Sequence, residues 1–131
     1  MDSTLHYLVA LALTPNLGPI TAKKLIAYCG GIEEVFKSRP KELSKIPGIG
    51  NTTVERMDFD KGKELADSEM LFCEKHNLHI LSYLNPDYPK KLLQCSDSPL
   101  VLFTKGNLDV LYKKRILAIV GTRHSTMYGK M

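Results

Sequence analysis

The stretch "IPGIGNTTV", residues 46–54, combines a tight turn with the start of a helix, and it sets the fold expected for the first half of the chain. A proline and two glycines lie between apolar residues, and glycine accepts positive φ and the close approach of another surface. Asn51 or Thr52 can cap a helix that turns Val54 and Met57 inward. The stretch therefore predicts a helix–turn–helix unit whose free backbone amides, at the helix start, form a site for an anion.

A second stretch of the same form, "LGPITAKKL", lies about thirty residues earlier, at residues 17–25. Apolar residues at helical spacing over residues 5–13 predict a helix before it. Thr21 can cap the helix that follows it, and Gly30 can end that helix in the left-handed conformation. Residues 1–60 are therefore predicted to form an all-α domain built from two helix–turn–helix units.

The two stretches resemble helix-hairpin-helix motifs, which occur in pairs in many DNA-binding proteins. "IPGIG" matches the apolar-Pro-Gly-apolar-Gly hairpin, whereas "NLGPI" departs from it because Asn16 takes the place of the first glycine. The resemblance implies that the backbone at Gly18, Gly48 and Gly50, with Lys23 beside it, contacts a nucleic-acid phosphate without reading sequence. The alternative is that these hairpins only pack or dock a protein partner.

The second half of the chain has the pattern of an α/β domain. Helical spacing continues to about residue 76, and three short apolar runs follow at residues 79–84, 99–106 and 115–121. Their apolar character is continuous rather than alternating, which is typical of strands covered on both faces of a parallel sheet. Residues 61–131 are therefore predicted to hold the first strands of such a sheet, in incomplete form, because three strands would leave a face and an edge exposed.

The stretch "ILAIVGTRHSTMYGKM", residues 116–131, has the pattern of a strand, a glycine turn and a helix start near Ser125. Ligands of open α/β sheets bind at the carboxyl ends of the strands, where hydroxyls and free amides can hold an anion. The guanidinium of Arg123 suits two phosphate oxygens or a base face. The predicted phosphate-binding residues are Gly121, Thr122, Arg123, Ser125 and Thr126.

This stretch has two other interpretations. A dinucleotide site needs Gly-x-Gly-x-x-Gly after the strand, but here Arg123 stands where the second glycine belongs and the next glycine is Gly129. A nicotinamide or flavin enzyme is therefore disfavoured, and no cofactor is expected. The plainer interpretation of Arg123 is a surface arginine paired with a carboxylate, and that of Tyr128 is a packing aromatic.

The composition is that of a soluble globular protein with unevenly distributed charge. The 131 residues are 44% hydrophobic and 24% charged, with a formal net charge of +4. Residues 103–131 contain six basic residues and one aspartate, so positive charge gathers around the glycine motif. Such a distribution fits the electrostatic steering of a polyanion.

The cysteines and the N-terminus indicate a reduced, non-membrane setting. The odd number of cysteines predicts free thiols, and Cys73 with His76 and His79 lacks a fourth ligand nearby, so no metal site is expected. The apolar run at residues 7–13 is shorter than the roughly 20 residues that span a bilayer. Asp2 precedes it and no lysine or arginine does, which is contrary to a secretory signal. A cytoplasmic location without a membrane partner is predicted.

Over its full length the chain resembles the bacterial DNA-processing family DprA, also called Smf. The paired hairpins carry the first part of this resemblance. Three later motifs carry the rest: Tyr-Pro followed by "KKLL" at residues 88–93, "SPLVLFTKGN" at residues 98–107, and "LAIVGTRHSTMYG" at residues 117–129. Their combination, in this order and spacing, is specific, although each motif alone is not.

The resemblance implies a SAM-like helical domain followed by a Rossmann-like domain. It also implies binding of single-stranded DNA, loading of the RecA recombinase in natural transformation, and homodimerisation of the full-length protein. The family's Gly-Ser/Thr-Arg motif falls on Gly121, Thr122 and Arg123. Family members continue well beyond residue 131, so the chain is expected to be a fragment with an incomplete pocket that binds DNA weakly.

Two functions from other classes stay open beside this one. No nucleophile–base pair is recognisable, so the chain is predicted not to be an enzyme, although Rossmann-like relatives include phosphoribohydrolase-like nucleotide enzymes. The helical domain at residues 1–60 can alternatively serve as a docking module for a protein.

Overall fold

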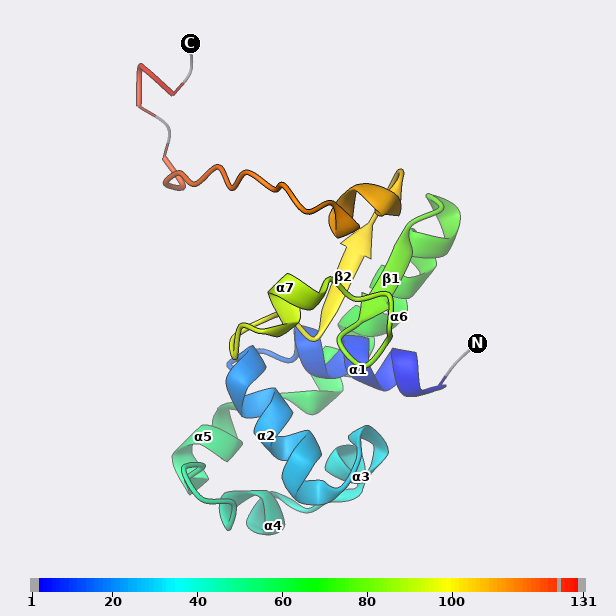
Figure 1. The fold of residues 1–131 in the computed structure, drawn as a ribbon. Coiled ribbons are helices and arrows are strands. Elements are labelled where there is room, and N and C mark those ends of the chain that lie inside the picture. The colour runs from blue at the N-terminus through cyan, green and yellow to red at the C-terminus, as the bar shows by residue number, and fades with distance from the viewer. Residues whose placement is uncertain (1–2, 125, 130–131) are drawn as a thin grey trace.

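The structure is a computed structural model, and it describes residues 3–124 and 126–129. Over these residues the chain is rich in helix and contains one small sheet of two antiparallel strands. Figure 1 shows α2 to α5 on one side of α1, and the sheet with α7 on the other side. The helices and strands are α1 (Ser3–Leu13), α2 (Pro19–Cys29), α3 (Ile32–Lys37), α4 (Pro40–Ser44), α5 (Asn51–Arg56), α6 (Phe59–Lys75), β1 (His79–Ser82), α7 (Lys90–Leu93), β2 (Val101–Thr104) and the 3-10 helix η1 (Leu108–Tyr112).

The predicted helices of the first half are present, but two of them begin differently from the prediction. The N-cap of α2 is Gly18 and that of α5 is Gly50, and neither makes a side-chain capping bond. The predicted caps, Thr21 for α2 and Asn51 or Thr52 for α5, instead lie within the helices. Pro19 explains the earlier start of α2, because its ring holds φ in the helical range and its missing N–H costs nothing in a first turn. Gly30 ends α2 in the left-handed conformation, as predicted.

One hydrophobic core joins the helical half to the sheet. α1 lies at its centre, with Leu8, Val9, Ala10 and Leu11 almost completely buried. Side chains from α2 to α6 surround this helix, and Leu100 and Val101 at the start of β2 belong to the same cluster. Because the burial of apolar surface is the main stabilising term, α1 is the element on which both halves depend.

The predicted domain division at residue 60 falls inside a continuous helix. α6 begins at Phe59, after an N-cap in which the Asp58 carboxylate accepts the Lys61 amide at 2.9 Å, and it continues to Lys75. His6 of α1 contacts Asp67 of α6 at 2.6 Å. The residues at the predicted boundary thus form the start of a helix packed on α1.

The prediction of a parallel sheet is wrong for the two strands that form. β1 and β2 are antiparallel, with His79 opposite Thr104 and Ser82 opposite Val101. A parallel pair needs a crossover connection, usually a helix that packs across the sheet, and in the connection here, residues 83–100, the only helix is the four-residue α7. Phe103, on the same face of β2 as the buried Val101, is exposed.

The predicted third strand, at residues 116–120, is not formed in this structure. These residues have no regular structure and are exposed, and Figure 1 shows the chain after η1 leading away from the body. A strand is stable only when its backbone pairs with a neighbour, and residues 116–120 pair with neither β1 nor β2. Within the described residues, no helix is long and apolar enough to cross a membrane.

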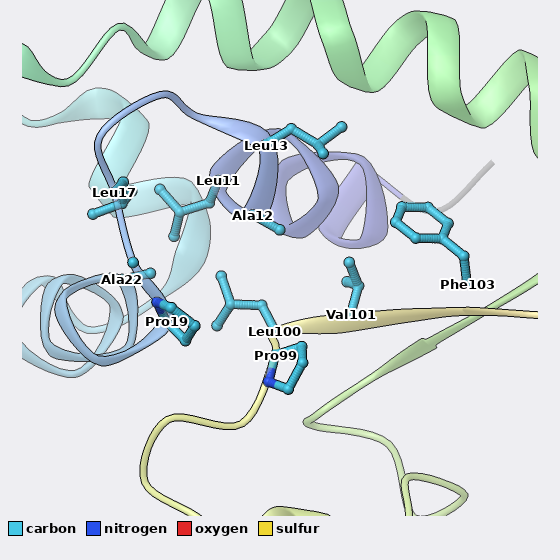
Figure 2. A pocket seen from close by; sticks show the side chains of 11 residues that line it. Leu11, Ala12, Leu13, Leu17, Pro19, Ala22, Pro99, Leu100, Val101 and Phe103 are labelled. Carbon is cyan, nitrogen blue, oxygen red and sulfur yellow. The ribbon is translucent and has the colours of Figure 1, made fainter. Parts of the chain in front are cut away.

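An apolar cavity of about 190 Å³ lies at the junction of the two halves. Figure 2 shows side chains from α1, from the α1–α2 turn and from β2 pointing toward one another across it, among them Leu11, Leu17 and Leu100. None of the residues that line it carries a titratable side chain. The cavity is therefore a feature of packing, and it offers no group for acid–base chemistry.

Candidate nucleic-acid interface

The two hairpin turns lie next to each other. The Asn16 side chain, in the first turn, donates to the Arg56 carbonyl at the end of α5 with a distance of 3.0 Å. Lys24 of α2 places its Nζ 3.7 Å from the position that a Cβ on Gly48 would take. Because these contacts join α2 to the second hairpin, both turns belong to one surface.

The positive φ values in these turns explain the departure from the hairpin pattern. Gly48 has φ +84°, which is a conformation that favours glycine. Asn16 has φ 63°, and asparagine is among the few residues that tolerate the left-handed region. Asn16 thus supplies the conformation for which the motif uses a glycine, which the sequence pattern did not reveal.

Lys23 and Lys24 have different surroundings although they are neighbours on α2. Lys23 is half-buried, and its Nζ lies 2.7 Å from Ser98 Oγ and 5.3 Å from the centre of the Tyr83 ring. Lys24 is exposed beside Gly48. Of the two lysines, Lys24 is the one that can reach an anion at the hairpins, whereas Lys23 joins α2 to the loop before β2.

The Tyr-Pro motif at residues 88–89 is part of the protein interior. Tyr88 is buried and its hydroxyl donates to the Pro99 carbonyl at 2.8 Å, which holds the loop that leads to β2. Burial raises the pKa of Tyr88, so the phenol stays neutral and available as a donor. The motif that carried part of the family resemblance therefore has a structural role in this chain.

The predicted phosphate-binding residues lie on the exposed C-terminal segment. The Thr122 hydroxyl donates to the His124 carbonyl at 2.8 Å, and the Gly129 amide donates to the Thr126 hydroxyl at 3.3 Å. Ser125 lies outside the described residues. The helix predicted to start near Ser125 is absent from residues 126–129, where the chain forms a turn; a helix nucleus is costly without packing, and this segment has none.

Arg123 is exposed and forms no ion pair with the described carboxylates. Its side chain is therefore free for an outside anion. It does not project from the rim of a sheet, because residues 116–120 form no strand here. The structure keeps the Gly-Thr-Arg segment well apart from the hairpins, so the two predicted sites do not form one pocket.

The Cys73 thiol is buried and not activated. Burial raises the pKa of the Cys73 thiol, with a smaller contribution from the negative charge of Glu69, and this favours the unreactive protonated form. Cys29 and Cys95 are also free. Within the described part of the chain, no three metal-ligating side chains come together.

Comparison with known proteins gives consistent matches. The family model described as DNA recombination-mediator protein A matches residues 79–131. Protein Smf of Synechocystis sp. is 30% identical over 134 residues, which cover 98% of this chain and 33% of that protein. DNA processing protein DprA of Bacillus subtilis is 39% identical over 56 residues, or 43% of this chain and 19% of that protein.

A further relative matches about half of the chain. Protein Smf of Escherichia coli is 34% identical over 64 residues, which are 49% of this chain and 17% of that protein. The chain thus spans about a third or less of the length of these curated relatives. No solved structure matches it.

Proposed function

Because the chain belongs to the DprA/Smf family of DNA-processing proteins, we propose that it binds single-stranded DNA with little sequence preference, as part of a recombination-mediating protein. The observation that carries this proposal is the free guanidinium of Arg123, on an exposed segment rich in hydroxyls and positive charge. An arginine fork holds two phosphate oxygens or stacks on a base, and neither contact depends on sequence.

The neighbours of Arg123 complete the proposed phosphate contact. Gly121 lets the protein backbone come close to the DNA strand, and the hydroxyls of Thr122, Ser125 and Thr126 donate to phosphate oxygens. The Thr122 hydroxyl donates to the exposed His124 carbonyl, so water can donate to that carbonyl instead when the hydroxyl turns to a phosphate.

The hairpin surface is proposed as a weaker second contact. Gly18, Gly48 and Gly50 bring backbone to the surface, and Lys24 adds a charge there. Lys23 supports the fold of this surface through its bond to Ser98. A role of the same hairpins in docking a protein partner would leave DNA affinity unchanged when Lys24 is replaced by alanine.

The finer family properties are proposals of the same kind. The intact protein is proposed to act in the cytoplasm as a homodimer, to help load RecA, and to build a Rossmann-like domain from residue 61 onward. In that domain residues 116–120 would pair as a strand, which would place Arg123 at a sheet edge. The boundary near residue 60 would then separate two folding units that α6 joins.

The test is the affinity of the intact protein for a fluorescent oligothymidine, measured by anisotropy at several salt concentrations. We expect Arg123→Ala to weaken binding roughly tenfold, because a hydrogen bond to a charged group contributes about 1.5 kcal/mol or more. Arg123→Lys keeps the positive charge but lacks the two-pronged guanidinium, so its affinity should lie between those of the unmodified protein and Arg123→Ala. Lys75→Ala, at the exposed end of α6, is the charge-matched control. Equal affinity of Arg123→Ala and the control would contradict the role of Arg123.

A further inference from the structure

A second basic surface forms where two distant segments of the chain meet. Lys91 of α7 donates from its Nζ to the Lys114 carbonyl at 3.0 Å, and this bond holds the segment after η1 against α7. Beside it lies a depression of about 280 Å³. It is lined by Lys90, Lys91, Leu111, Tyr112 and Lys113.

The charges of this surface are not compensated by the protein. Lys90, Lys91, Lys113, Lys114 and Arg115 are all exposed. None of them forms an ion pair with a carboxylate among the described residues, whose ion pairs all lie on α1, α3 and α6. Like charges this close together repel, so an external anion would stabilise the arrangement.

Tyr112 adds an aromatic group to the same depression. The residue is 48% exposed, and its hydroxyl donates to the Asp87 carbonyl, which fixes the ring beside the lysines. The nearby acidic residues are Asp87 and Asp109, and neither carboxylate pairs with a lysine of the depression. Basic groups beside an exposed aromatic ring are typical of surfaces that bind single-stranded nucleic acid.

We propose that this surface, formed by Lys90, Lys91, Tyr112 and residues 113–115, binds phosphates of the same DNA strand that contacts Arg123. The inference rests on the proposed function and adds a second, separate contact to it. Arg123 follows Arg115 by eight positions, at most about 29 Å of extended chain, so one DNA strand can follow both. A membrane partner is disfavoured because α7, with four residues, offers no amphipathic helix to insert.

The experiment compares two double variants of the intact protein in the same anisotropy titration. Lys90→Ala with Lys113→Ala removes two charges of the surface and leaves the bond of Lys91 in place. Lys41→Ala with Lys75→Ala removes two exposed lysines from α4 and α6. We expect the first pair to weaken binding about tenfold and to reduce the slope of log K against log salt by about 1.4, at about 0.7 per lost phosphate contact. The second pair should change neither quantity appreciably.

The possible results separate this inference from the proposed function. Weak binding by Arg123→Ala together with normal binding by the Lys90/Lys113 variant would overturn the second surface alone. Equal losses in both lysine pairs would also overturn it, because net charge and not position would then matter. Absence of oligonucleotide binding in the unmodified protein would overturn both proposals. If the Lys90/Lys113 variant lost binding to vesicles containing phosphatidylserine but kept its affinity for the oligonucleotide, the surface would be assigned to a membrane instead. Circular dichroism checks that each variant is folded.

Discussion

Gly62 lies in α6 at a contact with α1 that has no room for a methyl group. A Cβ at this position would be 2.5 Å from the Ala10 carbonyl oxygen, and it would also collide with the Thr14 hydroxyl. Alanine favours a helix over glycine by about 1 kcal/mol, but overpacking against fixed backbone costs about 1–3 kcal/mol or more. We therefore expect Gly62→Ala to lower the free energy of unfolding by about 1–2 kcal/mol, measured by urea titration with circular dichroism.

Ser68→Ala is the matched control for Gly62→Ala, because Ser68 is an exposed residue of the same helix. Its effect should stay within about 0.5 kcal/mol. A higher urea midpoint for Gly62→Ala than for the unmodified protein would show that α1 and α6 can move apart at this contact. Periodicity does not reveal this glycine as a packing residue, since it lies next to the predicted domain boundary among polar residues.

At the scale of elements, Lys23 connects α2 to the loop that leads into β2. Its Nζ donates to Ser98 Oγ at 2.7 Å, and Ser98 is buried. A hydrogen bond to a charged group contributes about 1.5–3 kcal/mol, so we expect Lys23→Met to lower the free energy of unfolding by about 1.5 kcal/mol. Lys24→Met, on the exposed side of the same turn, should change it little.

A double-mutant cycle tests whether the loss comes from this bond. Lys23→Met and Ser98→Ala should each destabilise the protein, and the double variant should be about 1 kcal/mol more stable than the sum of the two losses predicts. Strictly additive losses would mean that the two side chains act independently. The stability of each variant is measured by thermal and urea unfolding under the same buffer conditions.

At the scale of the whole molecule, residues 116–120 leave an apolar surface without a partner. Leu117 is 86% exposed and Ile119 is 92% exposed, and the run contains no charge and no proline. Such a segment is prone to pair with other chains. We expect the 131-residue chain to self-associate as its concentration rises, and Ile119→Lys to reduce this association, measured by sedimentation velocity.

Leu71→Lys provides the comparison, because Leu71 is an exposed apolar residue on α6 and lies outside that segment. It should leave the association unchanged. A chain that stays monomeric at high concentration, with or without Ile119→Lys, would show that residues 116–120 are protected in solution.

The sequence was sufficient for most of the helices, and the candidate site it indicates stays a prediction. Helical spacing and the stop signal at Gly30 depend on neighbouring residues, so α1 and α2 follow from local pattern. Clustered positive charge and a Gly-Thr-Arg segment are likewise visible in the order of residues. The relative direction of the strands is not visible in the sequence, because a short apolar run does not specify the strand with which it pairs.

By itself, the sequence determined most of the helices of the first half, the turns between them and where positive charge gathers, since these depend on residues close together in the chain. Only the tertiary structure decided that β1 and β2 run antiparallel, that Lys23 faces Ser98 while Lys24 faces the hairpins, and that α7 meets residues 113–115. Each of these joins residues distant in the chain, and such contacts form only when the apolar side chains of all elements pack into one core.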